Sequence, residues 1–284
     1  MRIGIIGKGF VGSAVEYGFS CDKKYKLDIF IYDKNPELSN NSLKETVNSS
    51  DIIFLSVPTP VNSDGSINLN IVDSALSEIN DCIKNDPIVL IRSTVTPGTS
   101  QIFKERYPKI NIVFNPEFLT ENNAKQDFVN QTRIILGGDD NLAEKVAALY
   151  RWRFGEEVDI IKTNFETAEF IKYMSNCFLA TKVSFMNEMK IIADYNKINW
   201  DEAVKGFAAD KRIGNSHTSV PGPDGKLGFG GSCFPKDIQA FINYAESLGI
   251  NPKILKSVWE TNLHVRPEKD WEKLIGRAVS DNTR

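Results

Sequence analysis

Short apolar runs alternate with amphipathic stretches along the first part of the chain. Most runs are rich in β-branched residues and are followed by a stretch of helical periodicity and a polar loop. The runs that we expect to form β-strands cover residues 2–7, 27–33, 51–58, 88–94, 111–118, 133–138 and 158–163. Continuous apolar strands separated by helices are typical of a parallel sheet covered on both faces. The pattern therefore predicts an α/β domain over residues 1–163.

The pattern becomes helical after residue 163. Residues 163–166 read Thr-Asn-Phe-Glu, the S/T-x-x-E form of a capping box. Residues 166–196 then contain neither Pro nor Gly, which predicts a helix much longer than is usual in globular proteins. We expect this helix to link two domains and to form part of a subunit contact. Further helices are expected over residues 199–209, 235–249 and 253–265. Residues 164–284 are thus predicted to form an all-α central and dimerisation domain.

A glycine-rich turn closes the first predicted strand. Gly7, Gly9 and Gly12 form G-x-G-x-x-G between a strand and a helix, and Asp33 ends the second strand. In a Rossmann-type sheet these glycines permit the tight turn, the approach of a pyrophosphate and close helix packing, respectively. A carboxylate at Asp33 would bind ribose hydroxyls and repel a 2′-phosphate, which favours NAD over NADP. The alternative is a glycine turn in a doubly wound fold that binds no dinucleotide.

Two further loops follow predicted strands, at residues 56–60 (SVPTP) and 92–98 (RSTVTPG). The carboxyl ends of the strands meet at the cofactor in such folds, so Thr59 and Thr94 would offer hydroxyl groups there. Taken alone, each threonine fits a turn or a helix cap better.

Lys172 and Asn176 are four residues apart in the long predicted helix, so both project from one face. They could form a site, but the spacing alone favours a solvated polar stripe.

The composition is that of an ordinary globular protein, with 284 residues, 41% hydrophobic, and a net charge of −3. This charge argues against non-specific binding to nucleic acid or to an anionic membrane. No apolar run is long enough to span a membrane, and the start lacks a signal-peptide pattern. The cysteines form no C-x-x-C pair and only two histidines occur. We therefore expect no metal site and a reducing, cytoplasmic environment.

The segment GFGGSCFPKD, residues 228–237, places Cys233 after three glycines and before a predicted helix. We interpret the glycines as clearing space for a substrate to approach the backbone. With Pro235 as the first helical residue, the helix N-terminus and Lys236 would lower the pKa of the Cys233 thiol. Asp237, one turn on, could hold a water or a hydroxyl group. The alternative is a buried structural cysteine, which is the better interpretation of the other three cysteines.

A dinucleotide fold with a nucleophilic thiol predicts a specific chemistry. A hydride acceptor oxidises an alcohol to an aldehyde, and a thiolate captures the aldehyde as a thiohemiacetal. A second hydride transfer gives a thioester, which water hydrolyses to an acid.

Several specific segments occur in one order along the chain: GKGFVG (7–12), SVPTP (56–60), RSTVTPGT (92–99), NPEFLTENNAKQDF (115–128), RIILGG (133–138), EFIKYMSNCFLATKVSFMNE (169–188), KRIGN (211–215) and GFGGSCFPKD (228–237). With them the chain resembles the UDP-glucose/GDP-mannose 6-dehydrogenase family. The resemblance implies NAD-dependent oxidation of the C6 alcohol of a nucleotide sugar, with UDP-glucose as the expected substrate, in polysaccharide biosynthesis. It also implies a homodimer.

The resemblance assigns roles to residues that match the family's segments. Cys233 corresponds to the nucleophile, and Lys172 with Asn176 to the pair that stabilises negative charge at the substrate oxygen. Asp237 corresponds to a carboxylate that positions water or takes a proton, and Thr94 to a threonine that holds the catalytic water. The remaining catalytic residues implied are Glu117, which orients water or substrate, and Glu121, the candidate base for thioester hydrolysis.

Binding residues are predicted in two sets. The cofactor site is expected to comprise Gly7, Gly9, Phe10, Val11, Gly12, Asp33, Pro58, Thr59, Thr94, Glu121 and Lys236. The substrate site is expected to comprise Phe118, Leu119, Lys172, Asn176, Arg212, Lys226, Phe229 and Gly230. The resemblance places Arg212 at a substrate phosphate across the dimer.

The chain departs from the family's pattern in two places. It ends at Arg284, about where the family's C-terminal UDP-binding domain begins. Residues 216–231 are longer and richer in Pro and Gly than the family's spacing, and we expect Lys226 or His217 to lie near the diphosphate there; the alternative is a solvated surface loop.

Three alternatives to the UDP-glucose activity stay open. The sugar could be GDP-mannose or a UDP-N-acetylhexosamine, since the matched segments do not separate them. The chain could also be a non-catalytic NAD-binding relative. A two-electron dehydrogenase of the 6-phosphogluconate type shares the fold plan but has no need of the cysteine segment.

Overall fold

The computed structural model describes residues 1–22 and 27–281. The described chain forms two compact units. The first contains Met1–Thr59 and Leu69–Lys172, and the second contains Pro60–Asn68 and Tyr173–Arg284. The division falls inside one helix, so the predicted domain boundary at residues 163 and 164 stays a prediction.

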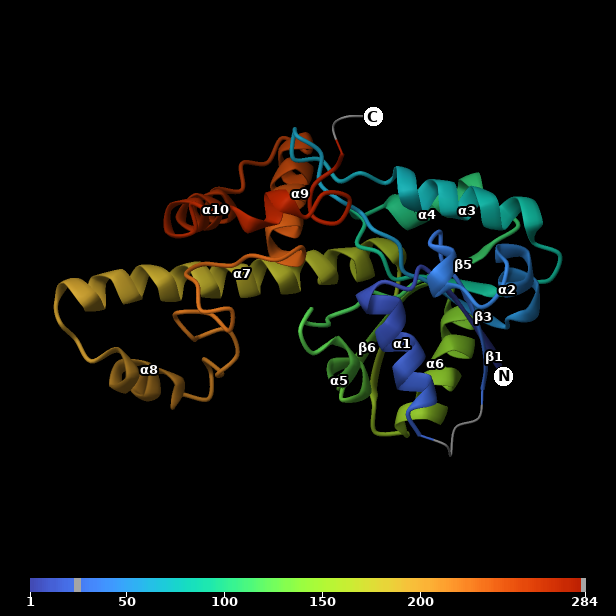
Figure 1. Cartoon of the computed structure of the whole chain (residues 1–284), viewed down its shortest axis with the longest axis horizontal. Coiled ribbons are helices and arrows are strands. Elements are labelled where there is room, and N and C mark those ends of the chain that lie inside the picture. The colour runs from blue at the N-terminus through green and yellow to red at the C-terminus, as the bar shows by residue number, and fades with distance from the viewer. Residues whose placement is uncertain (23–26, 282–284) are drawn as a thin grey trace. The chain divides into compact units, whose positions relative to one another are not determined.

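All the predicted strands are present. They are β1 (Arg2–Ile6), β2 (Asp28–Tyr32), β3 (Ile52–Leu55), β4 (Ile88–Ile91), β5 (Asn111–Phe114), β6 (Arg133–Gly138) and β7 (Asp159–Thr163). They form one sheet in the order β2-β1-β3-β4-β5-β6-β7 (Figure 1). The α/β fold class is confirmed, with one correction: β5 and β6 are antiparallel. An antiparallel neighbour needs no full crossover, and only the six-residue helix α5 separates these strands.

The helices follow the predicted order. They are α1 (Phe10–Ser20), α2 (Leu43–Ser49), α3 (Asn70–Cys82), α4 (Thr99–Arg106), α5 (Ala124–Val129), α6 (Asp140–Phe154), α7 (Phe165–Tyr195), α8 (Trp200–Ala208), α9 (Cys233–Ser247) and α10 (Lys253–Val265), with short 3-10 turns at Pro36–Leu38 and Asp270–Lys273. Within the described ranges, no helix is long and apolar enough to cross a membrane.

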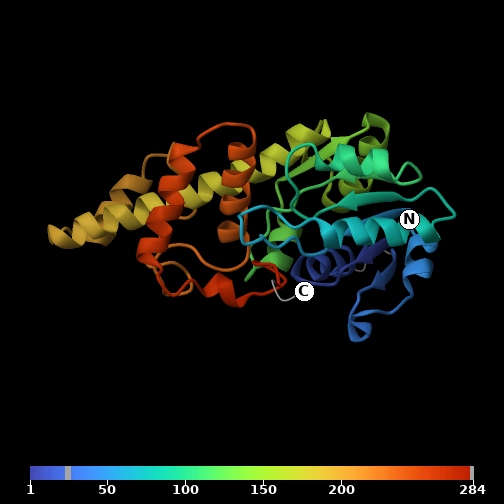
Figure 2. The same ribbon diagram turned by 90° about the horizontal axis from the view of Figure 1, so that it is seen from above.

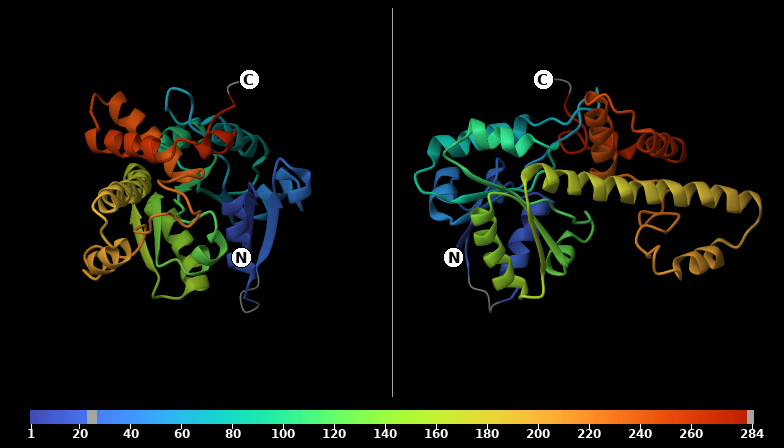
Figure 3. Two further views of the ribbon diagram at one scale, coloured as in Figure 1. Left: turned by 60° about the vertical axis from the view of Figure 1, so that its left-hand side comes forward. Right: turned by 180° about the vertical axis from the view of Figure 1, so that it is seen from behind.

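Two apolar cores lie on opposite faces of the sheet in the first unit. One core joins the sheet to α1, α5 and α6 through side chains such as Phe19, Phe128 and Tyr150. The other joins it to α2, α3, α4 and the first turns of α7. Figures 1 and 3 show these helices as a layer on each face. The strands are buried on both faces, which is why their sequences read as continuous apolar runs.

Helix α7 begins one residue later than a capping box at Thr163 requires. Thr163 instead ends β7, and the Asn164 side chain accepts the Thr167 backbone N–H at 2.9 Å. Asn is as good an N-cap as Thr, so Thr163 can belong to the sheet. The predicted capping box is therefore wrong, while the long helix is confirmed.

The second unit is helical. Its small core joins Cys177 and Ala180 of α7 to Ile238 of α9 and Val258 of α10. Figure 2 shows α9 and α10 packed across α7. Helix α9 begins at Cys233, not at Pro235 as predicted, so the cysteine itself is the first helical residue.

Candidate functional site

The glycine-rich turn joins β1 to α1. Gly7 has a φ of +88°, a conformation that favours glycine, and a Cβ on Gly12 would lie 2.1 Å from the Gly7 carbonyl oxygen. A Cβ on Gly9 would meet no atom within 4 Å. The Asp33 carboxylate, after β2, accepts the Lys8 backbone N–H at 2.6 Å. An open backbone at a helix start, beside a carboxylate, fits a pyrophosphate and its ribose.

Substitution by alanine should separate the two roles of these glycines. Gly12→Ala is expected to lower the free energy of unfolding by about 1–3 kcal/mol, because the added methyl group overlaps the turn. Gly9→Ala should lower stability by less than Gly12→Ala, because Gly9 is the N-cap of α1 but its methyl group would meet no atom. It should weaken NAD binding by about tenfold or more, because the methyl group takes the space of the pyrophosphate. Urea unfolding and calorimetry measure the two effects. Equal loss of stability in both variants would contradict this division.

The loops after β3 and β4 are tied to each other. The Ser93 hydroxyl donates to the Val57 carbonyl at 2.7 Å and accepts the Val57 N–H at 3.1 Å. Thr59 and Thr94 are both buried, while Pro58 is exposed. Both predicted threonines thus lie on fixed loops at the carboxyl ends of strands, where cofactor sites occur in such sheets.

A buried carboxylate holds the start of α4. Glu169 of α7 is fully buried and accepts the backbone N–H groups of Gly98 and Ser100 at 2.6 and 2.7 Å. Burial raises the pKa of Glu169 to about 7, although the two amides favour the charged form. The loop that carries Thr94 is therefore attached to α7 one turn before Lys172.

This pKa predicts how Glu169 affects stability. In the unfolded chain its carboxyl releases the proton near pH 4.5, and in the fold near pH 7. The fold binds more protons between these values, so the contribution of Glu169 to stability falls as the pH rises. The unfolding free energy of the native protein, minus that of Glu169→Gln, should fall by up to about 1.4 kcal/mol per pH unit there. Denaturant melts at pH 5, 6 and 7 measure it; a flat difference would contradict it.

Lys172 and Glu117 form a buried ion pair in the first unit. The Lys172 Nζ atom donates to the Glu117 carboxylate at 2.8 Å and to its backbone carbonyl at 2.5 Å. The second carboxylate oxygen accepts the Leu119 N–H at 2.7 Å, and the Phe118 ring lies 5.4 Å from Nζ. Lys172 is only 2% exposed, so the alternative of a solvated stripe is wrong. Glu121 lies half-buried in the next turn.

A second buried polar cluster lies at the start of α9. Asp237 is 1% exposed, accepts the Asn176 side-chain amide at 2.5 Å, and pairs with Lys236. Cys233 begins the same helix and is half-buried. Burial and the charge of Asp237 raise the pKa of the neighbouring Cys177 thiol far above its usual value. Cys177 is thus an inert core cysteine, as predicted. The same prediction is wrong for Cys21, which is exposed just after the end of α1.

The glycine loop, residues 227–231, does not clear space for a substrate in the way expected. A Cβ on Gly228 would lie 2.4 Å from the Asn262 side-chain oxygen, and a Cβ on Gly230 2.3 Å from the Arg266 guanidinium. The protein's own side chains occupy the space that these glycines leave. That interpretation is therefore wrong for Gly228 and Gly230, whereas a substrate contact at Gly230 stays a prediction.

Three predicted substrate residues contact other residues of the second unit. The Phe229 side chain belongs to the core of the second unit. Arg212 pairs with Asp210 at the surface, and Lys226 pairs with Glu268. Their proposed contacts with substrate stay predictions.

Sequence reasoning missed the side chains that hold the glycine loop. They are Asn187, Asn262, Arg266 and Asp270, and each bonds to the backbone of residues 227–231. The one available signal was the spacing of Asn262 and Arg266, four residues apart at the end of a predicted helix.

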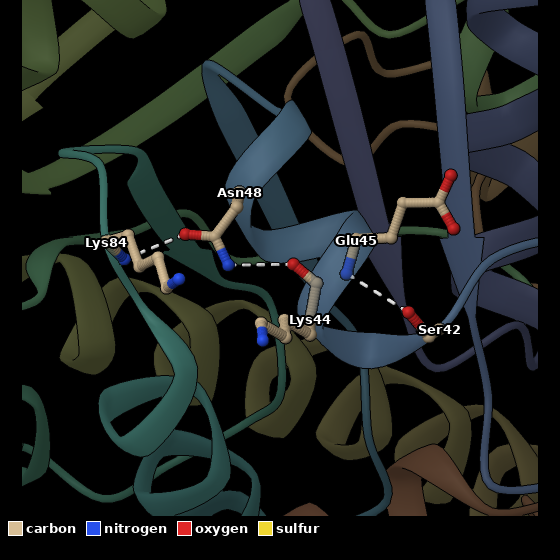
Figure 4. Close-up of a pocket in the computed structure, with 5 residues that line it drawn as sticks. All are labelled: Ser42, Lys44, Glu45, Asn48 and Lys84. Carbon is tan, nitrogen blue, oxygen red and sulfur yellow. Dashed lines mark hydrogen bonds between the residues drawn. The ribbon is translucent and has the colours of Figure 1, made fainter.

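A surface hollow between α2 and the end of α3 is lined by Ser42, Lys44, Glu45, Asn48 and Lys84 (Figure 4). Its polar groups serve local structure: Ser42 caps α2 at Glu45, and Asn48 accepts the Lys84 N–H at 2.7 Å. Asn48 also donates to the Lys44 carbonyl at 2.8 Å. The hollow contains none of the predicted site residues. In the described part of the chain, no group of three or more potential metal ligands is present.

Comparison with known proteins identifies a family for both parts of the chain. The NAD binding domain of the UDP-glucose/GDP-mannose dehydrogenase family matches residues 33–153, and the central domain of that family matches residues 166–264. The chain belongs to the UDP-glucose/GDP-mannose dehydrogenase family. It carries the family's NAD binding domain, so NAD is its cofactor.

Two curated relatives are UDP-glucose 6-dehydrogenases. That of Rickettsia felis is 33% identical over 92% of this chain and 64% of the relative. TuaD of Bacillus subtilis is 34% identical over 78% of this chain and 48% of the relative. The chain thus spans about two thirds of the length of the first of these relatives and about half of the length of the second.

Solved structures show the same fold. A UDP-glucose dehydrogenase from Pyrobaculum islandicum superposes with a TM-score of 0.81 at 30% identity, covering 93% of this chain and 68% of that one. A ternary complex of GDP-mannose dehydrogenase from Pseudomonas aeruginosa gives 0.65 at 26% identity, with 96% and 71% covered.

Proposed function

We propose that the protein oxidises the C6 alcohol of UDP-glucose to the acid of UDP-glucuronate, with Cys233 as the nucleophile. The observation that carries the proposal is the position of Cys233 at the first residue of α9, one turn before the buried Asp237. A helix N-terminus favours a thiolate. The names of the curated relatives favour UDP-glucose over other nucleotide sugars.

NAD fits the residues that would hold it. The open turn at Gly9 and the start of α1 would hold the pyrophosphate, and Asp33 would bind ribose hydroxyls. When bound, NAD⁺ supplies the hydride acceptor for both oxidations, one molecule for each.

The residues of the chain would act on the substrate in sequence. The Lys172 ammonium stabilises negative charge at the C6 oxygen as the alcohol passes its proton to the Asp237 carboxylate, directly or through water. The Cys233 sulfur then adds to the aldehyde carbon and holds the sugar as a thiohemiacetal, which becomes a thioester on the second oxidation. Glu121 takes a proton from the water that attacks the thioester carbon, and the Cys233 thiolate leaves. Asn176, Asp237 and Thr94 position the oxygen and water.

The number of NADH molecules formed per sugar tests the proposal. Purified protein is incubated with NAD⁺ and limiting UDP-glucose, GDP-mannose or a UDP-N-acetylhexosamine, and NADH is counted by absorbance. Two NADH per UDP-glucose and an acid product are expected. One NADH with an aldehyde product would contradict the thioester route. NAD binding without turnover of any sugar would favour a non-catalytic relative.

We also propose a homodimer formed along α7. Met174, Phe178 and Phe185 leave 52%, 66% and 47% of their surfaces exposed, and their spacing places them on one side of the helix. Such a stripe is typical of an interface. Light scattering should give twice the chain mass, and Phe178→Asp should give the single mass; a native protein of single mass would overturn this proposal.

A further inference from the structure

The backbone of the glycine loop is held by buried amide side chains. Asn262 of α10 is fully buried; it accepts the Phe229 N–H at 2.7 Å and donates to the Phe229 carbonyl at 3.0 Å. Asn187 of α7 accepts the Gly228 N–H at 3.0 Å. These bonds replace the pairing that a strand or helix would supply, and they fix a segment with no regular structure of its own.

Arg266, the residue that follows α10, holds both ends of the same loop. It is 2% exposed and donates to the Leu227 carbonyl at 3.1 Å, to Asp224 at 2.6 Å, and to Asp270 at 2.5 Å. The second Asp270 oxygen accepts the Gly231 N–H at 3.3 Å. Although burial opposes it, the bonds from Arg266 keep the pKa of the Asp270 carboxyl below its usual range. The buried guanidinium is thus charged, paired twice, and bonded to the loop.

The glycines complete this arrangement. With a Cβ, Gly230 would overlap the Arg266 guanidinium and Gly228 the Asn262 amide. The loop therefore lies against the side chains that bind it, and the next residues are Ser232 and Cys233 at the start of α9. Only Ser232 separates the loop from Cys233, so a shift of the loop would displace the first turn of this helix.

We propose that Arg266 is a positioning residue that holds the glycine loop and so keeps Cys233 in the first turn of α9. Together with Asn262 and Asp270, it explains why glycine occupies positions 228 and 230 before the cysteine. The importance of this position for turnover rests on the proposed function, whereas its effect on the thiol does not.

The test compares Arg266→Met with Lys256→Met. Both variants lose one positive charge at or next to α10, but Lys256 pairs with Glu246 at the surface, and no bond from it to the loop is found within residues 1–22 and 27–281. Alkylation of Cys233 by iodoacetamide is measured by peptide mass spectrometry, with the exposed Cys21 as internal reference. In Arg266→Met the rate at Cys233 should fall about fivefold or more relative to Cys21, because the frayed first turn no longer favours the thiolate. In Lys256→Met it should not change.

Amide exchange and kinetics complete the test. Amides of residues 227–234 should exchange about tenfold faster or more in Arg266→Met, since their acceptors are loosened. With UDP-glucose, kcat should fall about tenfold or more while the KM for NAD stays unchanged. If Arg266→Met does not fold, Asp270→Ala removes the acceptor of the Gly231 N–H and serves instead.

The outcomes separate the two proposals. A Cys233 alkylation rate within twofold of the native rate, or faster than it, in a folded variant would overturn the positioning role even if the enzyme is active. A slower rate in a protein that turns over no sugar would support the positioning role and contradict the proposed function.

Discussion

Cys233→Ser is expected to abolish formation of the sugar acid and to reduce steady-state NADH release by at least about 10³-fold. A serine hydroxyl at the start of α9 stays protonated at neutral pH, so it cannot capture the aldehyde as a thiolate does. NAD binding should be unchanged, because the open turn at Gly9 belongs to the first unit. NADH absorbance and product analysis with UDP-glucose measure the effect.

Cys82→Ser provides the matched control. Cys82 ends α3, and burial raises the pKa of its thiol, so it is expected to be unreactive and its replacement should leave turnover within about twofold. If Cys233→Ser formed the acid at the native rate, the thioester route would be excluded. If both variants lost activity equally, the loss would be one of folding and not of chemistry.

Much of the fold could be predicted because the spacing of apolar residues along the sequence follows which positions of each strand and helix are buried. Each strand lies within its predicted apolar run, and α10 has the predicted bounds, residues 253–265. The predicted start of α7 was wrong because one residue could belong to either of two neighbouring elements. Thr163 could cap α7 or end β7. It ends β7, because Asn164 caps the helix equally well.

The candidate site could be predicted only in part. The glycine turn and the position of Cys233 at a helix start could be predicted, because both depend on the identity and order of neighbouring residues. The burial of Lys172 depends on Glu117, 55 residues away, and the environment of Gly230 depends on Arg266. Spacing within one helix contains no information about such distant partners. For this reason spacing alone favours a solvated polar stripe at Lys172, and the glycines alone favour open space at Gly230.

Among single substitutions of charged residues in the first unit, those that break the buried pair of Lys172 and Glu117 should cause the largest loss of unfolding free energy. Removing one partner leaves an uncompensated charge inside the protein, which costs about 3–5 kcal/mol. Lys172→Met is therefore expected to lower the free energy of unfolding by this amount in urea melts. Lys162→Met, which breaks an exposed pair with Glu144, should change it far less.

The double variant Lys172→Met/Glu117→Gln separates stability from chemistry. With both charges gone, no charge is buried alone, and the unfolding free energy should recover most of the loss. Glutamine can still accept the Leu119 N–H that Glu117 now accepts. Turnover of UDP-glucose should not recover, because the cation at the C6 oxygen is still missing. Recovery of both would show that Lys172 is only structural; recovery of neither would show that the methionine does not fit the space that the lysine fills.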